Sequence, residues 1–166
     1  MTADWLRVDL PARFARLLTD YPGEPALDGV LLDELTLHHG GRLRIVWAPF
    51  DRLSADARLV IVGITPGRVQ AENALRGFRA ALRQGRSLGE ALAAAKATGS
   101  FSGPMRSNLV AMLDHVGANT ALGFDTTAVM FQTGAGAVHF TSALRYPVFR
   151  DGGNYNGTPN MLRTPV

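Results

Sequence analysis

Apolar residues recur every three or four positions along several segments of the chain, which is the period of an amphipathic helix. This period predicts a short helix over residues 11–21, because a proline stands at its start and Pro22 and Gly23 follow its end. The same period predicts three further helices, over residues 68–84, 87–97 and 104–116. The last of these begins at Pro104 and is followed by Gly117, which are typical helix boundaries.

Segments with a strand pattern alternate with these helices. Residues 35–50, LTLHHGGRLRIVWAPF, predict two strands joined as a hairpin at Gly40 and Gly41. Residues 57–63, ARLVIVG, form a continuous apolar and β-branched run, which predicts a strand buried on both faces. The next predicted strand is AVHFTSALRYPVF, residues 137–149. A strand followed by helices and another strand predicts an α/β fold with a parallel sheet between helical layers.

The composition limits the size and location of this fold. The chain has 166 residues, of which 46% are hydrophobic, so we expect one domain over residues 1–166. No run reaches the ~18 apolar residues of a membrane span, and the first residues lack the basic and then apolar pattern of a signal peptide. These features predict a cytoplasmic protein without a membrane partner.

Metal and thiol chemistry are disfavoured by the residue types present. The chain has no cysteine, which excludes disulfides, thiolate nucleophiles and cysteine-held zinc or iron–sulfur centres. Its four histidines, His38, His39, His115 and His139, do not have the spacing of metal ligands. We therefore expect no metal and no cofactor.

The basic residues are almost all arginine. The net charge is only +3, but of the 17 basic residues Lys96 alone is a lysine. Arginine makes bidentate contacts to phosphate, so this bias is compatible with a polyanionic partner. On the helix predicted over 68–84, and just beyond it, one face would carry Arg76, Arg79, Arg83 and Arg86. The spacing leaves open whether this face is merely solvated or binds nucleic-acid phosphates.

The stretch GITPG, residues 63–67, follows the apolar strand directly. In an open parallel sheet, ligands bind beyond the carboxyl ends of the strands, so this loop is expected to line a site. The two glycines allow the backbone to approach a ligand closely, and Pro66 restricts the backbone of Thr65. The loop matches neither the dinucleotide-binding nor the P-loop pattern. Taken alone, it is also compatible with a purely structural turn.

Three segments, taken in order, resemble the uracil-DNA glycosylase superfamily: GITPG, then SFSGPMRSNLVAMLDHVG at 100–117, then AVHFTSALRYP at 137–147. The pattern is most similar to the iron–sulfur branch, and the resemblance covers about residues 57–150. It implies a three-layer α/β/α fold with a short central parallel sheet. It also implies a DNA glycosylase, which turns a damaged base such as uracil out of DNA and hydrolyses its N-glycosidic bond. DNA, single- or double-stranded, is the implied partner.

The resemblance also implies roles for individual residues. It places water activation on the loop at Thr65, with Gln70 and Glu72 one turn further on as substitutes for an acid. Phe101, followed by Ser102, would stack on the base, although core packing would also explain this phenylalanine. Substrate contacts are implied at Gly63, Ile64, Pro66, Gly67, Phe101, Ser102, Ser142, Asn154 and Asn156. Apart from the resemblance, contacts to nucleic acid are predicted at Arg76, Arg79, Arg83 and Arg86, on the basis of their helical spacing, and at Arg145.

The sequence departs from the family pattern at two important positions. Thr65 stands where many members carry Asp or Asn, and a hydroxyl neither orients water strongly nor stabilises an oxocarbenium charge. Ser142 stands where the family carries a base-reading Asn. Two functions therefore stay open: an unusual glycosylase, or a non-catalytic descendant that binds a nucleobase, nucleotide or nucleic acid. A carboxylate in the pocket beside Thr65 and Phe101 would distinguish them, and an unrelated α/β enzyme is a third possibility.

The end of the sequence also differs from the family. Members continue into another helix, a last strand and a His-Pro-Ser loop, so we expect the C-terminal part of the family fold to be missing here. Residues 150–160, RDGGNYNGTPN, have the composition of an exposed loop. Its Asn154, Tyr155 and Asn156 either contact a base or phosphate or belong to a plain polar loop.

Overall fold

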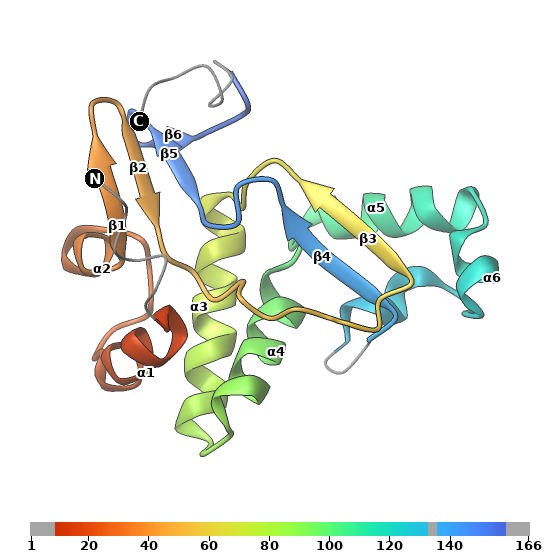
Figure 1. The fold of residues 1–166 in the computed structure, drawn as a ribbon, viewed down its shortest axis with the longest axis horizontal. Coiled ribbons are helices and arrows are strands. Elements are labelled where there is room, and N and C mark those ends of the chain that lie inside the picture. Colours follow the sequence, from red (N-terminus) through yellow and green to blue (C-terminus); the bar gives the residue numbers. More distant parts are fainter. Residues whose placement is uncertain (1–8, 133–135, 159–166) are drawn as a thin grey trace.

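A computed structural model describes residues 9–132 and 136–158 as a mixture of helices and strands (Figure 1). The first eight residues, Pro159 and Asn160 of the predicted loop, and the rest of the C-terminus lie outside the described residues. The helices are α1 (Leu10–Asp20), α2 (Gly29–Glu34), α3 (Arg68–Arg83), α4 (Leu88–Gly99), α5 (Pro104–His115), α6 (Ala118–Leu122) and the 3-10 helix η2 (Thr127–Phe131). The strands are β1 (Thr36–Gly40), β2 (Leu43–Val46), β3 (Leu59–Gly63), β4 (Val138–Ser142), β5 (Val148–Arg150) and β6 (Gly153–Asn154).

The strands form two sheets, and the α/β class predicted from the sequence is confirmed. One sheet is the parallel pair β3–β4, in register from Leu59 opposite Val138 to Gly63 opposite Ser142. The other is antiparallel, in the order β1-β2-β5-β6, and contains the predicted hairpin. This second sheet was not anticipated.

The strand predicted over residues 137–149 is in fact two strands in different sheets. β4 ends at Ser142, and the chain reaches β5 through a connection that includes Pro147, which has no N–H for a sheet ladder. The segment predicted as an exposed loop over 150–160 also contains a short hairpin, because β5 pairs with β6 through Phe149 opposite Asn154. These connections bring the antiparallel sheet to the carboxyl end of the parallel pair.

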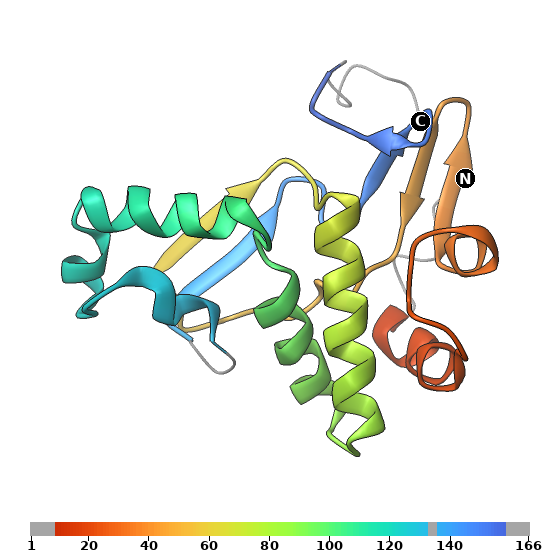
Figure 2. The ribbon, with the colours of Figure 1, turned by 180° about the vertical axis from the view of Figure 1, so that it is seen from behind.

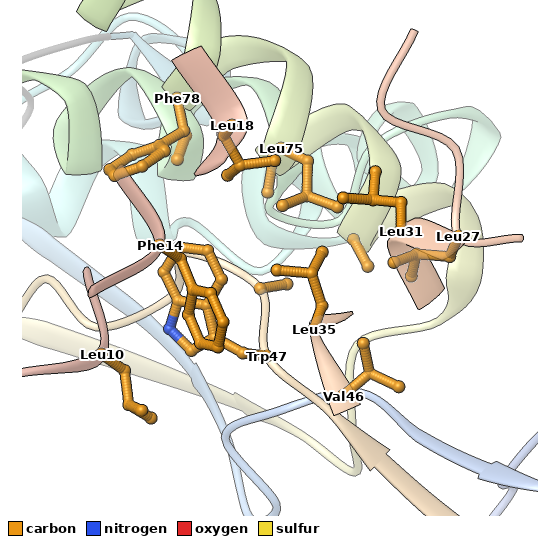
Figure 3. Packing of buried hydrophobic residues seen from close by; sticks show 14 of the residues in the cluster. Leu10, Phe14, Leu18, Leu27, Leu31, Leu35, Val46, Trp47, Leu75 and Phe78 are labelled. Carbon is orange, nitrogen blue, oxygen red and sulfur yellow. The ribbon is translucent and has the colours of Figure 1, made fainter. Parts of the chain in front are cut away.

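The main hydrophobic core joins α1, α2, α3 and α4 to the end of β2. Trp47 is fully buried at its centre, 4.8 Å from the ring of Phe14 and 5.7 Å from that of Phe78 (Figure 3). α1 begins where Asp9 caps the amide of Ala12, and its apolar period buries the side chain of Leu18. This core fixes α3, whose first turn faces the candidate site.

A second, smaller core lies under the parallel pair. Phe131 of η2 stacks on Phe140 of β4 with ring centres 4.6 Å apart. Leu59 and Ile61 of β3 pack against this cluster together with apolar residues of α5. The carboxyl end of the parallel pair therefore lies on a packed aromatic base.

The expectation that β3 is buried on both faces is wrong. Its side chains alternate, with Leu59 and Ile61 turned to the second core while Val60 and Val62 are 53% and 60% exposed. α5, α6 and η2 lie behind the parallel pair in Figure 1, and the reverse view in Figure 2 shows them in front of it. Of the helices that the structure describes, none covers the other face. The parallel pair therefore lies on one helical layer instead of between two.

No helix among the described residues is both long enough and apolar enough to span a membrane.

Candidate functional site

A cavity of about 320 Å³ opens at the carboxyl end of the parallel pair, within the size range of small-molecule sites of roughly 300–1,000 Å³. Eleven of the residues singled out from the sequence line it: Gly63, Ile64, Thr65, Pro66, Gly67, Gln70, Phe101, Ser142, Arg145, Asn154 and Tyr155. The loop, the segment before α5 and the end of β4 therefore form one pocket, and Thr65 and Phe101 both line it.

Several lining residues had not been identified from the sequence. They are Phe50, Gly99, Ser100, Met105, Phe140 and Thr141. Phe140 and Thr141 precede Ser142 on β4, and Gly99 and Ser100 precede Phe101, so proximity in sequence was an available signal for these four. Phe50 follows the hairpin, and no feature of its own segment indicates that it reaches the pocket.

Phe101 is held in an unusual backbone conformation. Its φ angle is +50°, in the left-handed region that non-glycine residues rarely adopt and that costs on the order of 1–3 kcal/mol. The turn is held because Ser102 N–H donates to the Gly99 carbonyl, and because the Arg106 guanidinium donates to the Ser100 carbonyl at 2.8 Å. The surrounding structure therefore fixes the position of the phenyl ring in the pocket.

Gly63 leaves room between this ring and β4. A Cβ at Gly63 would lie 3.3 Å from Ser142 Oγ and 3.9 Å from Phe101 Cζ. Within the described part of the chain, the Ser142 hydroxyl has no hydrogen-bond partner. The pocket therefore presents an aromatic ring and a free hydroxyl on either side of a glycine.

The hydroxyl of Thr65 is already committed to the fold. It donates to the Tyr146 carbonyl at 3.0 Å and accepts from the Val148 amide at 3.1 Å. These bonds tie the end of β3 to the start of β5. The geometry therefore supports a structural role for Thr65 and gives no support to water activation by this side chain.

The two residues proposed as substitutes for an acid point in different directions. Gln70 lines the pocket, and its Nε2 donates to the Ser102 carbonyl at 3.2 Å. Glu72 is two positions further along α3, about 200° around the helix, so it faces away. Its Oε1 accepts from the Leu27 amide at 3.0 Å, and it lies 3.9 Å from Arg76. Glu72 is therefore not placed to act on a ligand in this pocket.

Two predicted substrate contacts also lie outside the lining. Ser102 is buried, and its Oγ accepts from Asn73 Nδ2 at 3.0 Å, on the side of α3. Asn156 is exposed, and its Oδ1 accepts from the amide of Thr158 at 3.1 Å. Each of these side chains is engaged in a hydrogen bond within the fold.

Of the residues that the structure describes, no aspartate or glutamate lines the pocket. Asp51 is the neighbour of the lining residue Phe50, but its carboxylate accepts hydrogen bonds from Trp47 Nε1 and from the Tyr146 hydroxyl. Burial raises the pKa of Asp51 and, together with the bond to Asp51, the pKa of Tyr146. The charged side chain in the lining is that of Arg145, which is exposed.

The predicted arginine stripe is exposed only in part, because Arg76, Arg83 and Arg86 are exposed whereas Arg79 is buried. Arg79 is only 7% exposed and donates to the Gly23 carbonyl and, at 3.0 Å, to Glu24. Arg83 donates to the carbonyls of Thr19 and Tyr21 at 2.9 Å. The helical spacing places both arginines on one face, as expected, but this face is turned toward the loop after α1.

The other two arginines of the predicted stripe have different surroundings. Arg76 is exposed, donates to Asn73 Oδ1 at 2.6 Å and lies 3.6 Å from Glu24. Arg86 is exposed in the turn between α3 and α4, beyond the end of the helix.

Lys96 occupies a separate small cavity behind Phe140. Its ammonium group donates to the carbonyls of Arg52 and Phe140 and lies 3.4 Å from His139 Nδ1. Burial, and then repulsion from Arg145 and Arg52, lower the pKa of Lys96 to about 8. Across residues 9–132 and 136–158, no group of three or more His, Cys, Asp or Glu side chains is arranged to hold a metal ion.

Comparison with known proteins gives one relative without an assigned activity. The chain is 35% identical over 155 residues to the uncharacterized protein YoxB of Bacillus subtilis. This alignment covers 92% of the chain and 60% of YoxB, so the chain spans about three fifths of the length of its relative. No protein-family model and no solved structure matches the chain.

Proposed function

We propose that this pocket holds a nucleobase turned out of DNA, in the manner of the uracil-DNA glycosylase superfamily, and that it recognises the base without excising it. The observation that carries the proposal is the pocket itself, in which Phe101 and the GITPG loop meet and where no described carboxylate is present. Of the two functions that the sequence left open, an unusual glycosylase and a non-catalytic binding protein, the pocket favours the second.

The shape of the pocket suits a flat heterocycle. Phe101 is held rigidly and lies 5.6 Å from the ring of Phe140, so an aromatic surface is already in place before a ligand arrives. Stacking of a base on an aromatic side chain contributes about 1–3 kcal/mol and tolerates every base. Polar groups that can orient such a ligand come from Gln70, Ser142 and Asn154 at the edges.

Hydrolysis has less support than binding. Cleavage of an N-glycosidic bond builds positive charge on the sugar, which a glycosylase stabilises with a nearby carboxylate or with preorganised dipoles. Here the Thr65 hydroxyl is engaged by backbone groups, and Glu72 is engaged by the Leu27 amide. Neither side chain is free to provide that stabilisation.

Arg145 supports DNA as the partner. It is exposed and lines the pocket, so its guanidinium, which lies beside Tyr146 and Asp51, can also pair with a phosphate next to a base that has entered. The arginines of the predicted stripe contribute less to this pocket, because none of them lines it and because Arg79 and Arg83 bind the protein's own backbone.

The test measures binding and excision on the same oligonucleotides. Fluorescence anisotropy with single-stranded DNA that carries one uracil, hypoxanthine or xanthine should show binding that Phe101→Ala weakens roughly 5- to 150-fold, the equivalent of one lost stacking contact. Leu53→Ala is the matched control, because Leu53 is 70% exposed and does not line the pocket. Its affinity should equal that of the parent protein.

Two results would change the proposal. Alkali treatment reveals abasic sites, so base loss from any of these oligonucleotides would make the protein a glycosylase. Binding that is the same in the parent protein and in a folded Phe101→Ala variant would reject the pocket as the base site.

A further inference from the structure

Two side-chain amides meet at the start of α3, on the rim of the pocket. Gln70 comes from the first turn of that helix and Asn154 from strand β6, and both line the cavity. Each amide uses one of its two polar groups to bind the protein's own backbone. The other group of each amide, Gln70 Oε1 and Asn154 Nδ2, has no partner among the described residues.

The orientation of the Gln70 amide is set by its backbone partner. The group bound to the Ser102 carbonyl, at 3.2 Å, must be a donor, because a carbonyl only accepts. Nε2 is therefore directed at Ser102, and Oε1 remains as the free group. Gln70 offers the pocket an acceptor and not a donor.

The backbone partner of the Asn154 amide is a donor, so this side chain uses its oxygen and not its nitrogen for the backbone. The group bound to the Arg68 amide, at 2.9 Å, must be an acceptor, because a backbone N–H only donates. Arg68 also donates from its side chain to the Gly152 carbonyl at 3.3 Å, which holds the β5–β6 turn against α3. Asn154 therefore offers the pocket a donor, Nδ2.

Gly67 brings these two free groups together. A Cβ on Gly67 would lie 2.6 Å from Gln70 Oε1 and 3.2 Å from Asn154 Nδ2, so both atoms occupy the space that a side chain would take. The backbone of Gly67 is not in the left-handed region, so a special backbone angle does not account for glycine here. The absent side chain leaves room for the two amides.

From these contacts we infer that Gln70 and Asn154 form a specificity-determining pair that selects a neutral ligand edge with a hydrogen-bond donor beside an acceptor. The inference rests on the proposed function, because it describes how the same pocket would read a base. A uracil edge has this pattern in N3–H and its neighbouring carbonyl, and hypoxanthine has it in N1–H and O6. Carboxylates and phosphates present only acceptors, which Gln70 Oε1 repels.

Asn154→Asp tests the pair with little disturbance to the fold. Aspartate keeps an oxygen for the Arg68 amide but replaces the free donor with an acceptor. Asn156→Asp is the matched control, since it introduces the same charge two residues away and outside the lining. Binding of the single-uracil oligonucleotide should weaken roughly 10- to 100-fold with Asn154→Asp, as expected for a lost hydrogen bond to a ligand and an unpaired acceptor. With Asn156→Asp it should change no more than about twofold, the effect of an exposed charge.

A modified ligand tests the same pair without any mutation. In N3-methyluracil the donor is replaced by a methyl group, so an oligonucleotide with this base should bind the parent protein at least about tenfold more weakly than the uracil oligonucleotide. Equal binding of these two oligonucleotides, or an equal loss of affinity in both aspartate variants, would overturn the inference while Phe101-dependent binding still supported the proposed function. Absence of Phe101-dependent binding would overturn the proposed function and the inference with it.

Discussion

Thr65 shows how a single residue can occupy a candidate catalytic position and serve the fold instead. Its hydroxyl accepts a hydrogen bond from the backbone amide of the buried Val148 and donates one to the Tyr146 carbonyl. These two bonds connect the end of the parallel pair to the antiparallel sheet. Thr65→Val keeps the shape and removes both bonds, leaving a buried amide unpaired. We expect it to lower the free energy of unfolding by about 1–3 kcal/mol.

Urea denaturation of Thr65→Val and Thr65→Ser checks this prediction. Serine retains the hydroxyl, so Thr65→Ser should lose clearly less stability than Thr65→Val. Equal stability of the two variants would show that the hydroxyl bonds do not support the fold.

At the scale of elements, α3 is the helix that joins the core to the pocket. Arginines of α3 form hydrogen bonds to the loop after α1, where the Arg79 guanidinium donates to the carbonyl of Gly23. Glu24 also pairs with Arg79, but its side chain is 72% exposed, so this ion pair contributes little. We expect Arg79→Met to lower the free energy of unfolding by about 1–3 kcal/mol, because the part-buried hydrogen bond of its guanidinium to the Gly23 carbonyl is lost.

Arg86→Met is the control, because Arg86 is exposed beyond the end of α3, and its effect should stay within about 0.5 kcal/mol. Thermal and urea unfolding measure both changes. The salt dependence of DNA binding provides a second readout, since Arg79 does not reach a phosphate and its loss should leave the slope unchanged. A shallower salt-dependence slope for folded Arg79→Met would show that Arg79 does contact DNA phosphates.

At the scale of the whole molecule, the Lys96 side chain links the main hydrophobic core to the second core. It extends from α4, which belongs to the main core, to the Phe140 carbonyl of the second core and to the Arg52 carbonyl of the intervening segment. Its pKa is lowered to about 8 in the folded protein from an ordinary value of 10.5. Between these two pH values the unfolded chain binds a proton that the folded protein has released.

The stability contributed by Lys96 should therefore rise as the pH increases from about 8 to about 10.5 and level off above that range. The measurement is the free energy of unfolding in urea at several pH values, taken as the difference between the parent protein and Lys96→Met. This difference should change across that window and stay constant below it. A difference that does not vary with pH would mean that Lys96 has an ordinary pKa in the folded protein.

Local patterns determined most of the elements. The periods of α1, α3, α4 and α5, the hairpin at Gly40 and Gly41, and the β3 run are short-range features that an isolated segment already carries. The GITPG loop was located in the same way, since a glycine-rich turn after a buried strand is a local signal. The five residues of this loop were therefore identified as lining a site before the fold was known, whereas Phe101 and Ser142 were identified through the family resemblance.

The tertiary structure decided what those side chains do. The partners of Thr65, Glu72 and Arg79 lie from 45 to 83 positions away in sequence, and no local period indicates them. A continuous apolar run likewise does not show whether one face of β3 or both are covered, because burial depends on which elements pack against it. Hydrophobic periodicity thus determined which segments become helices and strands, whereas long-range hydrogen bonds and packing decided which polar groups remain free to meet a ligand.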